Sequence, residues 1–71
     1  MGENVYNVVE LVGTSTESWE RAAEAAVQRA SGTLRDLRVA EVVKLDLTVQ
    51  DGQVNSYRAR LKLSFKHELG K

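Results

Sequence analysis

The sequence Asn55-Ser-Tyr-Arg-Ala-Arg-Leu-Lys-Leu-Ser-Phe-Lys66 alternates residue by residue between a mostly apolar set and a wholly polar set. Successive side chains of a β-strand point to opposite faces of its sheet, so this alternation predicts a strand with one buried and one solvated face. The dipeptide Asp51-Gly52 precedes it and favours the positive φ angles of a tight hairpin turn. The stretch is therefore the second strand of a hairpin, and the rest of the chain must cover its apolar face.

Two further segments have the composition of strands. Val5 to Val12 is rich in β-branched residues, and Gly13-Thr14-Ser15 is expected to end it. Val39 to Val49 forms the first strand of the hairpin, and its apolar run is interrupted by three charged residues, Glu41, Lys44 and Asp46.

Between these strands the periodicity changes to that of a helix, from about Thr16 to Arg35. Apolar residues recur there at spacings of three and four and form one stripe: Trp19, Ala22, Ala23, Ala26, Val27, Ala30, Leu34 and Leu37. The position of Trp19 on this stripe predicts that its ring packs in the core. Three residues are competent helix N-caps, and the first of them has the spacing of a capping box with Glu17: Thr14, Ser15 and Ser18.

The order strand, helix, strand, hairpin, strand predicts an α+β fold of the β-α-β-β type in one domain, residues 1–71. Because the helix reverses the chain, the third strand lies between the other two in an antiparallel sheet of order 1-3-2, with a right-handed crossover. One helix covers only one face of such a sheet. Val42, either Val8 or Val9, and parts of Leu45 to Val49 are left without an intrachain partner, and an apolar surface of that kind predicts a homo-oligomer.

The composition excludes several classes of function. The 71 residues include no cysteine, which removes disulfides and thiolate metal sites, and the ten basic and ten acidic residues give no general attraction to nucleic acid. The polar start of the chain does not resemble a signal peptide, and no apolar run reaches the roughly 20 residues that span a bilayer. His67 is the only histidine, so one chain offers no His-based triad. We expect a cytoplasmic, non-enzymatic protein without a membrane or nucleic-acid partner.

Nearly the whole chain resembles the dodecin family. The resemblance rests on Val12-Gly13-Thr14-Ser15, Thr33-Leu34-Arg35, Glu41-Val42 and Asp51-Gly52, together with Ala30, Leu37 and Phe65 at matching positions. It implies the β-α-β-β fold and a hollow homododecamer. Typical dodecins bind flavins in pairs and are thought to store or sequester them.

Two positions of the family's flavin site are altered here. The resemblance places Val39 where typical dodecins carry a Trp that stacks on the flavin ring, and Arg58 where they carry a Gln that bonds the ring edge. Val39 has no π face, and Arg58 has donors but no acceptor. Asp46 also stands where flavin-binding relatives often carry a basic residue. These differences argue against flavin as the ligand.

One branch of the family, the calcium dodecins, is similar in these same regions. The similarity covers Thr14-Ser15 through Ser18-Trp19-Glu20, Ala26-Val27-Gln28-Arg29-Ala30, Leu37-Arg38-Val39-Ala40, Asp46, Tyr57-Arg58 and Ser64-Phe65-Lys66. The resemblance implies a dodecameric shell that binds calcium in place of flavin. It does not identify the calcium ligands of this chain.

Calcium prefers six to eight oxygen ligands, so dispersed acids of one short chain require help from symmetry-related copies. Asp46 is the leading candidate ligand because it is a charge within an otherwise apolar strand, and Glu41 and Asp36 are weaker candidates. The alternative is a salt bridge from Asp46 to a basic residue of the hairpin: Lys44, Arg58 or Lys62.

Three functions remain from the sequence. The first is a homododecameric shell that binds a small ligand or ion, with calcium favoured over flavin. The second is sequestration of a flavin or another phosphate-bearing nucleotide by a row of basic residues: Arg58, Arg60, Lys62 and Lys66. The third is a structural shell without a ligand.

Overall fold

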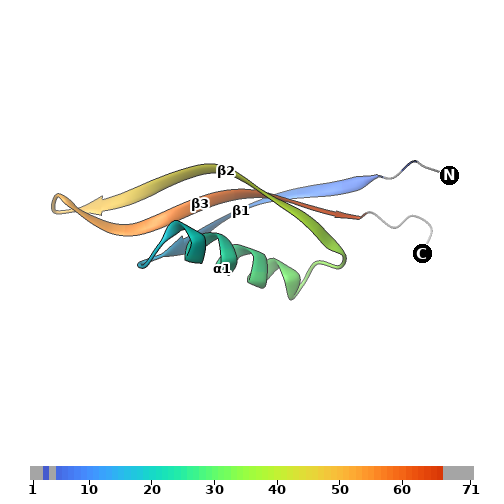
Figure 1. The fold of residues 1–71 in the computed structure, drawn as a ribbon, viewed down its shortest axis with the longest axis horizontal. Helices are drawn as coiled ribbons and strands as arrows, with labels where there is room; N and C mark the ends of the chain where they lie inside the picture. The colour runs from blue at the N-terminus through green and yellow to red at the C-terminus, as the bar shows by residue number, and fades with distance from the viewer. Residues whose placement is uncertain (1–2, 4, 67–71) are drawn as a thin grey trace.

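The computed structural model describes residue 3 and residues 5–66. It consists of β1 (Tyr6–Ser15), α1 (Trp19–Ser31), β2 (Leu37–Gln50) and β3 (Gln53–Lys66). The strands form one antiparallel sheet in the order β1-β3-β2, with α1 lying along one face (Figure 1). The predicted β-α-β-β fold and strand order are therefore confirmed. His67 lies outside the described residues.

The helix is shorter than the predicted range from Thr16 to Arg35. It begins after Ser18, whose extended backbone and side-chain oxygen make it the N-cap, since the oxygen accepts a hydrogen bond from the Arg21 amide at 3.0 Å. Thr14 is not the cap, because it is still part of β1. The helix ends at Ser31, where Gly32 follows and its amide bonds back to the Arg29 and Ala30 carbonyls.

The first strand is longer than predicted, because Thr14 and Ser15 continue to pair with Arg58 and Tyr57 of β3. Gly13 therefore does not end the strand. Its role is close packing: a Cβ atom at this position would overlap the backbone carbonyl of Ala22 in α1. Only glycine lets the helix approach the strand this closely.

The hairpin between β2 and β3 turns at Asp51 and Gly52, with φ angles of 53° and 76°. Positive φ at both central residues is the requirement of the tight turn that matches the twist of paired strands. The predicted turn is confirmed.

The core lies between α1 and the centre of β3. Every buried apolar side chain among the described residues belongs to these two elements: Ala22, Ala26 and Ala30 from the helix, and Ala59, Leu61 and Leu63 from the strand. Val9 and Leu11 of β1 pack against this cluster. The alanine stripe and the predicted apolar face of β3 are thus confirmed as the two surfaces in contact.

The helix is much shorter than the sheet that it covers. Its 13 residues span about 20 Å, whereas the 14 residues of β2 span about 46 Å. Figure 1 shows the β2–β3 hairpin extending well beyond the helix. No residue of β2 is fully buried, and its large apolar side chains are exposed: Val39, Val42, Val43, Leu45, Leu47 and Val49. Within the described part of the chain, no helix has the length and apolarity needed to cross a bilayer.

Candidate functional site

The sheet face opposite α1, called here the open face, carries the polar side chains of β3. The strand register arranges this face in rows that run across β1, β3 and β2. The rows are Thr14–Arg58–Asp46, Val12–Arg60–Lys44, Glu10–Lys62–Glu41 and Val8–Ser64–Val39. Arg58, Arg60 and Lys62 of the central strand therefore form a line of basic residues along this face. Acidic residues of the edge strands lie beside Arg58 and Lys62.

Arg58 and Asp46 form a two-point ion pair across the β2–β3 ladder. Arg58 Nε donates to Asp46 Oδ1 at 2.7 Å, and Arg58 Nη2 donates to Asp46 Oδ2 at 2.8 Å. Planar matching of this kind gives the pair a fixed geometry as well as charge. Of the three partners considered from the sequence, the structure selects Arg58 for Asp46.

The ion pair alters the titration of both groups. The hydrogen bond from Arg58 lowers the pKa of Asp46 below its usual 3.8, and the charges of Arg58, Lys44 and Arg60 act in the same direction. The hydrogen bond to Asp46 raises the pKa of Arg58 above its usual value. Because the Asp46 pKa is depressed, the contribution of the pair to stability is complete only well above the ordinary pKa of 3.8, and it is lost as the pH falls through the lowered value. The pair is intact at neutral pH.

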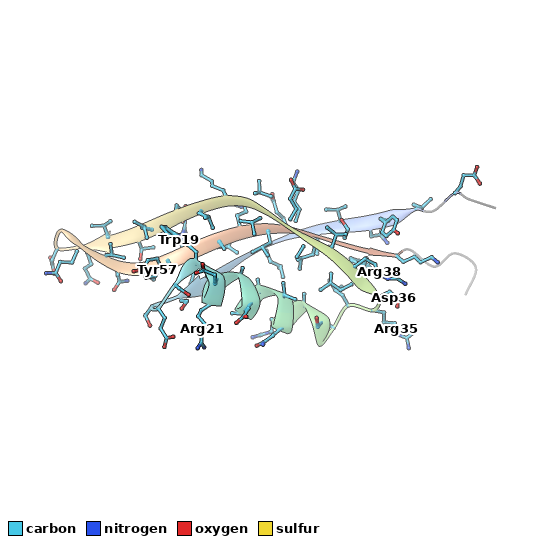
Figure 2. All side chains as sticks on the ribbon, viewed as in Figure 1. Trp19, Arg21, Arg35, Asp36, Arg38 and Tyr57 are labelled. Carbon is cyan, nitrogen blue, oxygen red and sulfur yellow. The ribbon has the colours of Figure 1, made fainter. Side chains whose placement is uncertain are left out.

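Trp19 fixes the backbone of Asp46 from the helix side. Its indole Nε1–H donates to the Asp46 carbonyl oxygen at 3.0 Å, and its ring meets Tyr57 edge to face, with centroids 5.2 Å apart (Figure 2). Because β2 is an edge strand, half of its backbone groups have no partner in the sheet, and this hydrogen bond satisfies one of them. Trp19 is half-buried, so it lies at the margin of the core and not within it as predicted.

The two altered flavin positions lie far apart in one chain. Val39 pairs with Ser64 of β3, six residues along the strand from Arg58, which corresponds to about 20 Å. Both belong to the open face, and Val39 is exposed. One small ligand cannot contact both positions of the same chain, so a site that includes both needs two chains.

The three predicted metal ligands do not come together. Asp46 is held by Arg58, and Glu41 lies opposite Lys62 in another row. Asp36 lies in the α1–β2 loop with a φ angle of 54°, at the end of the helix remote from Trp19 (Figure 2). Within the described ranges, no group of three or more His, Cys, Asp or Glu side chains is placed to hold a metal ion.

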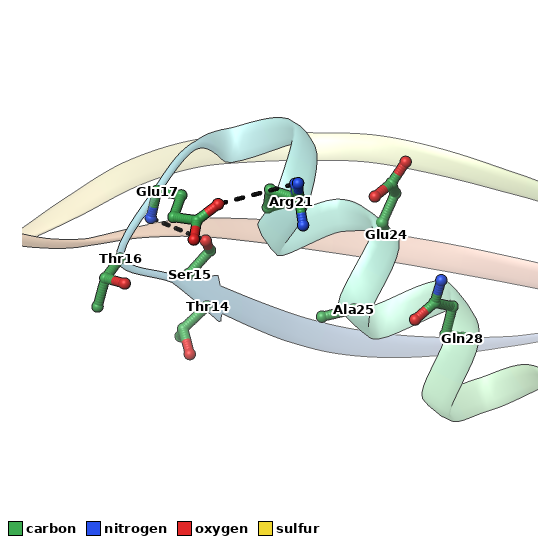
Figure 3. Close-up of a pocket in the computed structure, with 8 residues that line it drawn as sticks. All are labelled: Thr14, Ser15, Thr16, Glu17, Arg21, Glu24, Ala25 and Gln28. Atoms are coloured by element: carbon green, nitrogen blue, oxygen red, sulfur yellow. Dashed lines mark hydrogen bonds and ion pairs between the residues drawn. The ribbon is translucent and has the colours of Figure 1, made fainter.

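A polar hollow of about 390 Å³ lies where β1 leads into α1 (Figure 3). Its lining comes from the strand end and the first turns of the helix: Thr14, Ser15, Thr16, Glu17, Arg21, Glu24, Ala25 and Gln28. The Ser15 hydroxyl accepts a hydrogen bond from the Glu17 amide at 2.9 Å, and Glu17 pairs with Arg21 at 3.9 Å. Both charged groups are largely exposed, which indicates a solvated surface.

A second hollow, of about 360 Å³, is apolar. It lies between the start of α1 and the edge strand β2, and it is lined by Trp19, Glu20, Ala23, Val42 and Leu45. The sequence did not predict this hollow, because its position depends on how α1 lies relative to the edge strand β2. The only related feature of the sequence is the apolar composition of β2.

Comparison with known proteins identifies similar chains. A family profile described as Dodecin matches residues 5–68. The calcium dodecin of Mycobacterium tuberculosis is 46% identical over 63 residues, covering 89% of each chain. The dodecin of Thermus thermophilus is 44% identical over 64 residues, covering 90% of this chain and 93% of the relative.

Solved structures show the same similarity in three dimensions. The dodecin from Streptomyces coelicolor superposes with a TM-score of 0.88 at 43% identity, covering 96% of this chain and 97% of that one. A calcium dodecin from Mycobacterium tuberculosis, described as having a novel calcium-binding site, superposes with a TM-score of 0.81 at 44% identity, covering 94% and 96%.

Proposed function

This chain belongs to the dodecin family, and we propose that it is a non-enzymatic, homododecameric protein that binds and stores a small ligand or ion, with calcium favoured over flavin. The main support for this proposal is that neither of the two altered flavin positions has a side chain available to bind a flavin ring. Val39 offers no ring for stacking, and the Nε–Nη2 edge of Arg58 is already occupied by Asp46.

Assembly is supported by the apolar surface that one chain leaves exposed. Val42 and Leu45 of β2 are each 49% exposed, and Val8 on the open face is 56% exposed. Contiguous apolar side chains on an edge strand favour association, since burial of such area is the main driving force between chains. Self-association also supplies the second chain that a site with both Val39 and Arg58 requires.

Calcium is supported by the similarity to calcium dodecin and by the distribution of the acids. Glu41 and Asp36 are exposed and have no ion pair within the described part of one chain, so their oxygens are available to a cation shared between copies. Asp46 acts as a ligand only if Arg58 is displaced. We therefore place Glu41 and Asp36 ahead of Asp46 as calcium ligands.

Calcium binding is tested on the assembled protein by isothermal titration calorimetry, with light scattering to establish its mass. We expect calcium to bind and to raise the melting temperature relative to a chelator, because a ligand that binds only the assembled state stabilises it by mass action. Magnesium should act more weakly, since it demands tighter octahedral geometry. Glu41→Gln should weaken calcium binding more than Asp46→Asn does. A particle whose melting is unaffected by either cation would argue for a shell without a metal.

Flavin is tested in parallel by the quenching of riboflavin fluorescence. We expect little quenching by the parent protein, and a gain in the double variant Val39→Trp with Arg58→Gln, which restores an aromatic face and an amide. Tight riboflavin binding by the parent would contradict the preference for calcium.

A further inference from the structure

We propose that Asp46 is a built-in anion that keeps external oxyanions away from Arg58 and thereby determines the ligand selectivity of the open face. The external ligands excluded in this way are phosphates and phosphate monoesters. This selectivity depends on the charge arrangement within one chain and does not require calcium binding.

The ion pair occupies one edge of the Arg58 guanidinium. The two parallel hydrogen bonds, of 2.7 and 2.8 Å, occupy the Nε–Nη2 edge of Arg58, which is one of the edges that a guanidinium offers to a phosphate. An oxyanion at the remaining edge would lie beside the Asp46 carboxylate and be repelled by it. Asp46 therefore excludes an oxyanion in two ways, because it occupies one edge of Arg58 and its negative charge repels an anion at the other edge.

Two further cations lie next to the ion pair. Lys44 and Arg60 oppose each other in the row next to the ion pair, and the charges of both lower the pKa of Asp46. Three cations thus surround one carboxylate. Two hydroxyl groups lie one row beyond the pair, where Thr48 Oγ1 and Ser56 Oγ are 2.6 Å apart. Without Asp46, this patch has the cations and hydroxyls that bind phosphate oxygens.

The Asp46 backbone is held in place by the helix. The indole N–H of Trp19 bonds the Asp46 carbonyl at 3.0 Å, and Tyr57 packs against the Trp19 ring. The short aspartate side chain has few rotamers, so a fixed backbone leaves its carboxylate opposite Arg58. Trp19 is in this sense a positioning residue for the pair.

The ion pair lies at the surface of the sheet, so the Asp46 carboxylate can be removed without disturbing the buried core. The two side chains are 39% and 36% exposed, and ion pairs at such surfaces are strongly screened by water. Asp46→Asn retains the size of the side chain and removes its charge. We expect the variant to fold and assemble as the parent does, which circular dichroism and light scattering establish.

The experiment measures binding of inorganic pyrophosphate to the assembled protein at low ionic strength by isothermal titration calorimetry. We expect Asp46→Asn to bind pyrophosphate about tenfold more tightly than the parent, the change that one charge-assisted hydrogen bond produces. The double variant Asp46→Asn with Arg58→Gln should lose this gain, because the guanidinium is then absent. Equal affinities of the parent and Asp46→Asn would overturn the proposal.

Glu10→Gln is the matched control for net charge. It removes one negative charge from the same face, but from the β1 end of the Lys62 row and away from Arg58. A gain as large as that of Asp46→Asn would mean that net charge alone controls binding, and would overturn the proposal. Asp46→Ala is a second variant that removes the same carboxylate, and it should show a similar gain in pyrophosphate affinity. A gain confined to Asp46→Asn would overturn the proposal.

Discussion

The two strands of the hairpin have the same length and pair with each other, yet the apolar side chains of β3 are buried and those of β2 are exposed. On β3, Ala59, Leu61 and Leu63 are at most 1% exposed, whereas on β2, Val42 and Leu45 are each 49% exposed. The central strand has a neighbour on both sides and the helix above it, while β2 has an open edge and little contact with α1. An apolar pattern therefore determines which face a side chain takes, and the place of the strand in the sheet determines whether that face is covered.

The largest expected effect comes from closing the space between the helix and β1. Gly13→Ala would place a methyl group on the Ala22 carbonyl, and the helix would have to move off the sheet. We expect a loss of more than about 3 kcal/mol in the free energy of unfolding, because overpacking at a backbone contact cannot be relieved by a side-chain rotation. Chemical denaturation followed by circular dichroism measures it.

Gly32→Ala is the control for this substitution. Gly32 has a φ angle of −75°, and a Cβ atom there meets its nearest neighbour, the Arg29 carbonyl oxygen, at an ordinary 3.5 Å. This variant should retain the stability of the parent. If Gly13→Ala were equally harmless, close packing of α1 on β1 would not be what this glycine provides.

The next largest effect compares the loss of an apolar side chain from β3, which α1 covers, with the same loss from β2, which is exposed. Leu61→Ala removes a buried side chain from the core and should lower the free energy of unfolding by about 3 kcal/mol. Leu45→Ala removes a side chain that one chain leaves half exposed, so it should weaken assembly while the secondary structure persists. Light scattering and circular dichroism together distinguish the two results. An unchanged particle mass for Leu45→Ala at high dilution would indicate that Leu45 is not part of a contact between chains.

The smallest effect concerns the start of the helix that covers β3. Ser18→Ala removes the oxygen that accepts from the Arg21 amide, and we expect a loss of about 1 kcal/mol, typical of an N-cap. Thr16→Ala, in the same loop but not a cap, should have little effect. Thermal melting of the two variants compares them directly, and a larger effect at Thr16 would contradict the assignment of the cap.

Sequence periodicity determined the architecture of this protein. The alternation from Asn55 to Lys66 predicted which side of β3 is buried, and the alanine stripe predicted the helix surface that packs on it. The pair Asp51-Gly52 predicted the turn. These features are local, since each depends on a repeat or a φ angle that neighbouring residues fix by themselves.

The tertiary structure alone decided the partner of Asp46. Counted from the two-residue turn, an uninterrupted ladder places Arg58 opposite Leu45, but an irregularity between Thr48 and Val49 shifts the register by one residue. Arg58 then lies opposite Asp46, which the sequence had left open between a metal ligand and a salt bridge. The alternation of side chains along one strand does not change when its neighbour contains an extra residue. The hydrophobic pattern of neither strand therefore reveals this shift in register. The sequence therefore predicted the faces of the strands, and only the folded ladder determined which charges meet across them.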